Sequence, residues 1–347
     1  MVRNATVPRS VADDRSRIQS SARRVQCLDG QSASLRDAKR RGCSDTKTLS
    51  RAGRPNKGIE TPAEYSVNAR VIFLLPYLLG LGPGWQVYNR QAVEGRVRLL
   101  ILSDIHSNIE ALQACLLAAP EYDVVVNLGD IVGYGANPNE AVERSRRLGG
   151  YVVRGNHDKA ASGIMDLGDF NPLAGMAALW TRNQLSEENV EWLRQLPRGP
   201  IHIPELPQAQ FVHGSPADED EYLVTADDAI ESLSSVSVPL TFFGHSHLQG
   251  AFTSYPGGEG SLRPVYASVG RAEVVDWTLE EHRHYLINPG SVGQPRDGDW
   301  RAAFATFDSE RKIVTFNRVP YDLKAAQDRI LAANLPPRLA TRLSAGR

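Results

Sequence analysis

The sequence predicts an α/β (α+β) fold in which two β-sheets pack together and helices cover them on the outside. From residue 97, apolar runs typical of buried strands alternate with segments of helical periodicity. Beyond about residue 249, short strands separated by Gly and Pro turns follow one another directly. Alternation followed by consecutive strands is the pattern of two packed sheets with helices outside. We therefore expect residues 97–347 to form one domain.

The first part of this domain is predicted to alternate between strand and helix. Residues 98–103 form an apolar run, and the helix at residues 108–119 places Ile109, Leu112 and Leu116 on one face. The next elements are a strand at residues 123–129, a helix that begins at Asn137-Pro138 and stops at Gly149-Gly150, and a strand at residues 151–154.

Residues 160–197 interrupt the alternation and are predicted to be a helical insertion. One helix spans residues 173–185, and a second begins at the N-cap Ser186 and ends before Pro197. Phe170 and Trp180 of this insertion either form a lid or pack in the core. The elements that follow are strands at residues 200–203, 209–212 and 238–243, a helix at 226–233, short strands to about 319, and one or two closing helices within 321–343.

Short polar clusters follow the apolar runs of this domain. Because α/β sheets gather functional groups at strand ends, we expect the clusters to meet. They offer carboxylate, amide and imidazole groups but no thiolate, which suits two Mn, Fe or Zn ions. Two such ions activate water and hold phosphoryl oxygens, so the pattern indicates a two-metal phosphoester hydrolase. The candidate ligands are Asp104, His106, Asp130, Asn156, His213, His245 and His247.

Taken singly, each cluster has a simpler explanation. Asp-x-His or Gly-Asp after a strand is more often a turn, and His213 alone would be an ordinary histidine near a loop. The pair His245 and His247 is a stronger signal, yet by itself it is evenly balanced between metal binding and packing. The occurrence of all the clusters in order, each after a strand-like run, favours the metal site.

The ordered motifs Asp-x-His, Gly-Asp, Gly-Asn-His-Asp, His-Gly and Gly-His-x-His resemble those of the calcineurin-like metallophosphoesterase superfamily over residues 97–320. The resemblance implies a four-layer αββα sandwich of two mixed β-sheets flanked by helices, with a dinuclear metal centre. It also implies that His157 is the general acid during in-line attack by a metal-bridging hydroxide. The implied ligands are Asp104, His106 and His247 for the first metal, Asn156, His213 and His245 for the second, and Asp130 as the bridge.

Two departures separate the chain from the protein phosphatases of that superfamily. Those enzymes typically carry Arg soon after Gly-Asp and Glu after Asn-His, whereas here Ile-Val-Gly-Tyr-Gly follows Asp130 and Asp158 follows His157. The chain is more similar to the compact bacterial phosphodiesterase branch. Asp158 either orients His157 or caps the next turn. Asn288 and Arg296 either contact the substrate or belong to a Pro-Gly turn that closes the sheet.

Residues 1–96 form a separate basic segment, with 17 Lys and Arg against 8 Asp and Glu. Few long apolar side chains occur in residues 1–65, so we expect disorder. The segment is an unstructured extension, a targeting or nucleic-acid-binding tail, or upstream sequence translated from a misplaced start, with the natural start near Val97. The apolar run at residues 71–82 is shorter than the roughly 20 residues of a membrane span, so no membrane partner is expected.

Residues 97–347 carry 22 basic against 32 acidic residues, which argues against a nucleic-acid surface. We expect a small phosphoester substrate whose charge the metals meet. Cys27, Cys43 and Cys115 show no paired spacing, which fits a reducing, cytoplasmic compartment. The alternatives are a dinucleoside polyphosphate or pyrophosphate hydrolase, a protein phosphatase, and a non-catalytic interaction module of the same fold. Nothing in the sequence indicates the oligomeric state.

Overall fold

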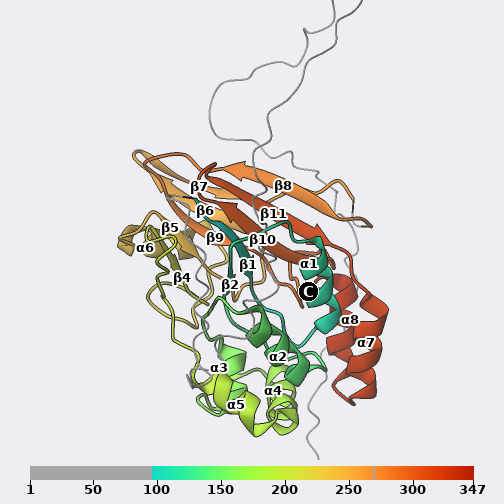
Figure 1. Cartoon of the computed structure of the whole chain (residues 1–347). Helices are drawn as coiled ribbons and strands as arrows, with labels where there is room; N and C mark the ends of the chain where they lie inside the picture. Colours follow the sequence, from blue (N-terminus) through green and yellow to red (C-terminus); the bar gives the residue numbers. More distant parts are fainter. Residues whose placement is uncertain (1–95, 269) are drawn as a thin grey trace, which may run out of the picture. The chain divides into compact units, whose positions relative to one another are not determined.

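A computed structural model describes residues 96–268 and 270–347, which form two β-sheets with helices on their outer sides (Figure 1). The expectations for the basic N-terminal segment, including disorder and a start near Val97, concern a part of the chain outside the described residues. Within the described ranges, no helix is long and apolar enough to cross a membrane.

The first sheet has six strands in the order β3-β2-β1-β10-β11-β8. Strands β1, β2 and β3 are parallel, and β10 joins them by pairing antiparallel with β1. The sheet is therefore mixed, with three parallel strands at one side. The strands are β1 (Arg98–Leu102), β2 (Val124–Asn127), β3 (Tyr151–Val152), β8 (Glu273–Thr278), β10 (Ala302–Asp308) and β11 (Ile313–Val319).

The second sheet repeats this arrangement with five strands in the order β4-β5-β9-β6-β7. Strands β4, β5 and β9 are parallel, and β6 pairs antiparallel with both β9 and β7. Each sheet thus contributes three parallel strands whose carboxyl ends point the same way. The strands are β4 (Ala209–Phe211), β5 (Leu240–Phe242), β6 (Gly250–Tyr255), β7 (Gly258–Leu262) and β9 (His284–Asn288).

The core lies on both faces of the first sheet. On strand β1, Leu99 and Ile101 face the second sheet, whereas Leu100 and Leu102 face the helices. Both sets are fully buried, which is why the strand is a continuous apolar run in the sequence. Between the sheets, the rings of Phe211 and Phe242 stack at a centroid distance of 5.4 Å.

Helices complete the outer layers, and the predicted four-layer αββα sandwich of two mixed sheets is confirmed. Helices α1, α2, α7 and α8 pack their apolar residues on the outer face of the first sheet. Helix α6 lies on the outer face of the second sheet against β6 and β9. Their bounds are α1 (Ile109–Ala118), α2 (Pro138–Leu148), α6 (Ala226–Ser235), α7 (Leu323–Ala332) and α8 (Pro337–Ala345).

The region between β3 and β4 is helical, as the sequence indicates, but two details differ. A helix already begins at Asn156, because the Asp158 carboxylate accepts a hydrogen bond from the Gly155 amide and caps its first turn. The strand expected at residues 200–203 is reduced to an isolated bridge between Ile201 and Phe211. The elements are α3 (Asn156–Ser162), the 3₁₀ helix η3 (Leu167–Asp169), α4 (Pro172–Gln184) and α5 (Glu187–Arg194).

Candidate metal centre

The loops that follow the parallel strands of both sheets carry the candidate ligands. Asp104 and His106 follow β1, and Asp130 follows β2, all in the first sheet. Because the carboxyl ends of parallel strands share one edge, these loops and those of the second sheet come together. In chain order the complete set is Asp104 and His106 after β1, Asp130 after β2, Asn156 after β3, His213 after β4, and His245 and His247 after β5.

Five of these residues have a left-handed backbone. The φ angles are 53° for Asp104, 48° for His106, 53° for Asp130, 63° for His245 and 59° for His247. Such a conformation costs a non-glycine residue on the order of 1 kcal/mol or more, and it clusters at functional sites. On an extended strand, residues two apart point to the same side, but the backbone at Asp104, His106, His245 and His247 is not extended. Left-handed turns beyond the strand ends bring these side chains together.

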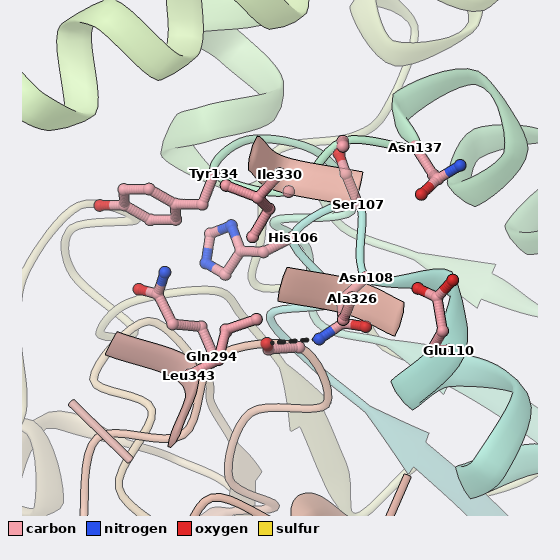
Figure 2. Close-up of a pocket in the computed structure, with 13 residues that line it drawn as sticks. His106, Ser107, Asn108, Glu110, Tyr134, Asn137, Gln294, Ala326, Ile330 and Leu343 are labelled. Atoms are coloured by element: carbon pink, nitrogen blue, oxygen red, sulfur yellow. Dashed lines mark hydrogen bonds between the residues drawn. The ribbon is translucent and has the colours of Figure 1, made fainter. Parts of the chain in front are cut away.

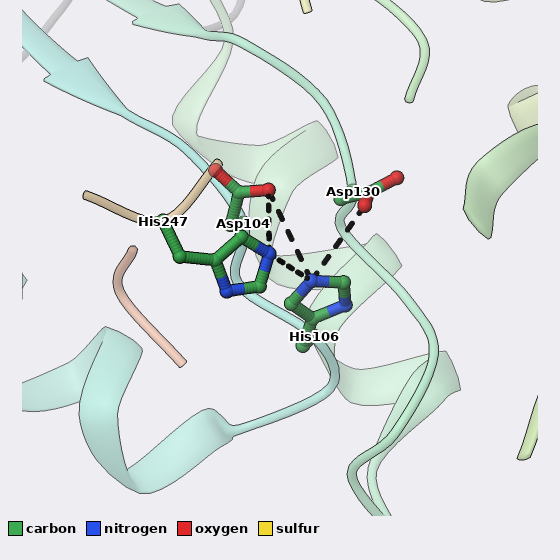
Figure 3. A group of neighbouring side chains, drawn as sticks. All are labelled: Asp104, His106, Asp130 and His247. Carbon is green, nitrogen blue, oxygen red and sulfur yellow. Dashed lines mark hydrogen bonds and ion pairs between the residues drawn. The ribbon is translucent and has the colours of Figure 1, made fainter. Parts of the chain in front are cut away.

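The first group of donors consists of Asp104, His106, Asp130 and His247, all buried and with one ligand atom each within 4.8 Å of the others (Figure 3). The Nε2 atoms of His106 and His247 lie 3.1 Å apart. His247 Nε2 is 3.2 Å from Asp104 Oδ1, and His106 Nε2 is 3.6 Å from Asp130 Oδ2. This convergence of two carboxylates and two imidazoles is able to hold one metal ion.

The second group consists of Asp130, His213 and His245, which converge in the same way. His213 Nε2 lies 3.4 Å from Asp130 Oδ2. Asp130 therefore belongs to both groups, as a bridging ligand must. The buried Oδ1 atom of Asn156 has no hydrogen-bond partner within the described residues, and Asn156 lines the same cavity as His245.

Hydrogen bonds to backbone carbonyl groups fix the tautomers of the four histidines. Nδ1 of His106 lies 3.0 Å from the Val132 carbonyl, and Nδ1 of His213 and His247 makes equivalent contacts. A carbonyl oxygen only accepts, so Nδ1 carries the proton and Nε2 presents its lone pair to the centre. His245 is reversed, because its Nε2 donates to the Asp220 carbonyl at 3.0 Å and leaves Nδ1 free.

Charges in this buried site are strongly coupled. Burial raises the pKa values of Asp104 and Asp130, but His247 and His213 outweigh it, so both carboxylates stay ionised. Burial lowers the pKa of His213, yet the Asp130 carboxylate overcomes this and raises it to about 10. Any proton that Nε2 of His213 holds without metal would have to leave before that atom could bind an ion.

The donor set fits two metal ions on structural grounds. Among the described residues, Asp104 Oδ1, Asn156 Oδ1 and His213 Nε2 are buried and have no hydrogen-bond partner. Buried polar atoms are nearly always paired, so three unpaired ones at one point require an explanation. The oxygen and nitrogen donors suit Mn, Fe or Zn.

His157 lies beside both groups and presents a neutral ring. Its backbone amide donates to Asp130 Oδ1 at 2.9 Å. The centroid of its ring lies 4.4 Å from that of the Tyr134 ring and 4.9 Å from that of the Phe170 ring. Burial lowers its pKa to about 4, and the positive charge of Arg296 contributes in the same direction. Its Nδ1 atom is buried without a hydrogen-bond partner in the described part of the chain. His157 also lines a cavity of about 320 Å³.

Asp158 acts in the capping role, which was one of its two predicted roles. Its Oδ2 accepts from the Gly155 amide at 3.0 Å, and its Oδ1 accepts from the amides of Ile131 and Val132 at 3.0 and 3.2 Å. The carboxylate ties the start of α3 to the loop that carries Asp130. It makes no hydrogen bond to the His157 ring within the described residues.

Asn288 and Arg296, the two candidate substrate contacts, differ in their surroundings. Asn288 is fully buried; its Nδ2 donates to the Gly244 carbonyl at 2.8 Å and to Ser246 Oγ at 3.0 Å. The prediction that Asn288 contacts the substrate is therefore wrong, because its amide holds the loop that carries His245 and His247. Arg296 is half-buried and donates to Gln294 Oε1 at 3.2 Å.

A cavity of about 320 Å³ opens beside His157 and His245. Tyr134, Phe170 and Tyr222 give it aromatic walls. Phe170 thus serves as a wall residue, although it also packs against the core. The centroids of the Tyr222 and His245 rings lie 3.7 Å apart, and no metal-type motif in the sequence surrounds Tyr222 to indicate it. A smaller pocket on the other side of His106 is lined by Tyr134, Gln294 and Leu343, among others (Figure 2).

Known proteins share this domain. Residues 97–312 match the calcineurin-like phosphoesterase superfamily domain. An uncharacterised protein of Methanocaldococcus jannaschii is 37% identical over 254 residues, which cover 72% of this chain and 98% of that protein. A crystal structure of a metallophosphoesterase from Sphaerobacter thermophilus shares 39% identity and has a TM-score of 0.61, over 72% of this chain and 99% of that chain.

A hypothetical protein from Pyrococcus horikoshii OT3 has a TM-score of 0.57 at 22% identity, over 72% of this chain and 99% of its own, and supports the fold alone. The matched domain contains every candidate metal ligand, from Asp104 to His247. The chain belongs to the calcineurin-like phosphoesterase superfamily.

Proposed function

We propose that this protein hydrolyses a small phosphodiester or phosphomonoester at a centre of two metal ions. The observation that carries the proposal is the pair of Asp and His groups that share Asp130, beside a cavity. When bound, two such ions polarise the phosphoryl oxygens and provide a nucleophilic water at neutral pH. The residues that would hold them are Asp104, His106 and His247 for one ion, Asn156, His213 and His245 for the other, and Asp130 for both.

The chain's own contribution to the reaction is the placement and protonation of His157. Its ring is neutral near pH 7 without substrate, because burial lowers its pKa to about 4. A phosphoester bound against the ring brings negative charge, which raises that pKa. In this proposal the protonated ring then donates to the leaving oxygen as a general acid. Tyr134 and Phe170 pack against the ring and contribute to its burial.

The test is hydrolysis of p-nitrophenyl phosphate and bis-p-nitrophenyl phosphate by the full chain, stripped of metal and then titrated with Mn²⁺. We expect turnover only with metal. The substitution His157→Ala should lower kcat by about 100- to 10,000-fold, the range for loss of a general acid. His282→Ala, at an exposed histidine outside the site, is the matched control and should keep full activity.

One result would count against this function, and another would count only against the role of His157. Failure to hydrolyse any phosphoester with Mn²⁺, Fe²⁺ or Zn²⁺ would favour a non-catalytic interaction module. Unchanged turnover in His157→Ala, with metal bound as in the parent protein, would leave the enzyme in place but remove His157 from the acid role.

A further inference from the structure

The cavity beside the metal centre is lined both by polar groups and by aromatic rings. Its polar lining includes His157 and the candidate metal ligand His245, and its aromatic lining consists of Tyr134, Phe170 and Tyr222. Its volume of about 320 Å³ lies at the lower end of the roughly 300–1,000 Å³ that small-molecule sites occupy. A small ligand that fills this cavity therefore has to match a polar surface and an aromatic surface at once.

The aromatic rings of the cavity lie directly beside its two histidines. The centroid of the Phe170 ring is 4.9 Å from that of His157, and the centroid of the Tyr222 ring is 3.7 Å from that of His245. The buried Tyr134 ring packs against His157 as well, at 4.4 Å. The organic group next to a phosphoryl group held at these histidines therefore meets aromatic carbon atoms.

Tyr222 keeps much of its surface exposed although its ring is held in place. The residue is 49% exposed, whereas Phe170 is half-buried and Tyr134 is buried. The Tyr222 ring packs on His245, and its hydroxyl accepts a hydrogen bond from Arg296. A ring that is already fixed loses little conformational freedom when a ligand covers it. Tyr222 is thus the aromatic residue of this cavity with the most surface left for a ligand to cover.

The charges around the cavity favour a neutral organic group. Among the described residues, no lysine or arginine lines the cavity, and Asp220 supplies its one carboxylate. That carboxylate is already paired, because Asp220 Oδ1 accepts from Lys159 Nζ at 2.7 Å. The lining therefore offers no cationic side chain to a second phosphate. An uncharged ring suits it better, since aromatic side chains attract the faces and edges of other rings.

We propose that Tyr222 and Phe170 form a subsite for a neutral planar ring in the organic group of the substrate, while its phosphoryl group lies at the metal centre. The substrate class is then a phosphoester whose organic group carries an aromatic or heteroaromatic ring, and esters of short alkyl alcohols are poor substrates. This inference rests on the proposed function and narrows it. Tyr222 is the residue that determines this specificity.

The test is calorimetric binding of phosphonates, which lack a hydrolysable ester bond, to the full chain with Mn²⁺ at one saturating concentration in cell and syringe. Phenylphosphonate, cyclohexylphosphonate and methylphosphonate carry the same phosphorus group with a planar ring, a puckered ring and a single methyl group. We expect phenylphosphonate to bind at least about 10-fold more tightly than methylphosphonate, with cyclohexylphosphonate between them, because only the planar ring stacks.

Substitutions at Tyr222 test whether its ring causes the preference. Tyr222→Leu should lower the ratio of phenylphosphonate to methylphosphonate affinity below about threefold, because leucine keeps apolar bulk but has no flat face. Tyr222→Phe keeps the ring and should keep the ratio. A ratio cancels any change at the metal ions, which both ligands share. Tyr255→Leu is the matched control, because Tyr255 is a half-buried tyrosine at the end of β6 outside the cavity lining, and it should keep the full ratio.

Equal affinity for phenylphosphonate and methylphosphonate in the parent protein would overturn the subsite. So would an unchanged ratio in Tyr222→Leu, which would show that Tyr222 only supports His245. These outcomes are separable from the proposed function. Metal-dependent ester hydrolysis without any preference among the phosphonates refutes the subsite alone, whereas a Tyr222-dependent preference without any hydrolysis supports the subsite and refutes the enzyme.

Discussion

Two buried polar regions of this protein differ in how completely their atoms are paired. At the metal centre, Asp104 Oδ1, Asn156 Oδ1 and His213 Nε2 are buried without hydrogen-bond partners in the described part of the chain. The second region, which we call the arginine network, leaves none of its buried side-chain atoms unpaired within the same residues. It comprises Arg301, Arg318, Asp297, Asp299, Glu273, Gln249 and Tyr266.

In the arginine network every donor finds a carboxylate, amide or carbonyl oxygen. Arg318 bonds to Asp297, to Gln249 Oε1 at 3.1 Å and to the Arg301 carbonyl at 3.2 Å. The Gln249 amide nitrogen in turn donates to the Pro289 carbonyl at 2.9 Å. This network connects β11 to the loop that ends β9. Its role is explained by the fold without any ligand.

The backbone shows the same contrast. Arg318 lies within the regular strand β11, whereas five residues of the metal centre adopt left-handed φ angles beyond the ends of their strands. An unpaired buried polar atom and a strained backbone each cost free energy. Both are retained at the metal centre and neither in the arginine network. The difference teaches that unpaired carboxylate, amide and imidazole atoms gathered at one point, and not burial of charge alone, distinguish the candidate metal centre from the arginine network.

Breaking the arginine network should give the largest loss of stability. Arg318→Met leaves Asp297 and Gln249 without their buried donor and should lower the free energy of unfolding by about 3–5 kcal/mol. Urea unfolding in the presence of EDTA measures this without a contribution from metal. Arg311→Met, at an exposed arginine, should change stability by less than about 0.5 kcal/mol. Similar stabilities of the two variants would show that the network does not hold the fold.

A substitution at the metal centre should have a smaller effect, and that effect should appear in metal affinity and not in the free energy of unfolding. The buried Ser103 hydroxyl donates to Asp104 Oδ2 at 2.6 Å and orients that carboxylate. Ser103→Ala should weaken Mn²⁺ binding by about 10- to 100-fold, measured by calorimetry on metal-free protein. Ser145→Ala is the control, because the buried Ser145 hydroxyl has no hydrogen-bond partner in the described residues and lies in α2. Equal Mn²⁺ affinity in Ser103→Ala and the parent would show that the hydrogen bond from Ser103 does not support metal binding.

Part of the fold could be predicted because central strands such as β1 are buried on both faces. The run at residues 98–102 alternates between two cores, with Leu99 facing one and Leu100 facing the other, so all its residues are apolar. The polar residues that follow such runs stand out, and this is why the candidate ligands are visible in the sequence. The helix at Asn156 was missed because its cap, Asp158, falls inside the same polar cluster.

Contacts that depend on tertiary packing could not be predicted. Arg342 is one of two arginines in the amphipathic helix α8, and only the packing of that helix in the folded domain places it near Tyr134. The left-handed turn at Asp104 likewise has no glycine to indicate it. Periodicity reports which face of an element is buried, but not which distant side chain lies opposite. Asn288 illustrates the reverse error, since a polar residue at a strand end proved to hold a neighbouring loop.

A third cluster of buried charged residues adjoins the metal centre, but its charges form ion pairs. A substitution in this cluster should have the smallest effect on the free energy of unfolding. Glu219 accepts from Arg154 Nη2 at 2.8 Å and from Lys159 Nζ at 3.1 Å, and the neighbouring Asp220 carbonyl accepts from His245. Burial raises the pKa of Glu219, but the hydrogen bonds from Arg154 and Lys159 lower it below its usual value of 4.5. The folded protein therefore binds fewer protons than the unfolded chain in this range. The stabilisation is complete above pH 4.5 and is lost as the pH falls through the folded pKa.

Glu219→Gln should thus lower the free energy of unfolding by about 1 kcal/mol at pH 7 and by progressively less as the pH is lowered toward 3. Metal-free protein is used at both pH values, so that release of metal in acid does not contribute. Glu221→Gln, at an exposed glutamate nearby, should show no such difference at either pH. If the loss in Glu219→Gln is as large at pH 3 as at pH 7, packing of the side chain and not its charge holds this cluster. Packing, and not ion pairing, would then hold the loop of Asp220 against His245. Complete pairing of charges would no longer distinguish this cluster from the metal centre.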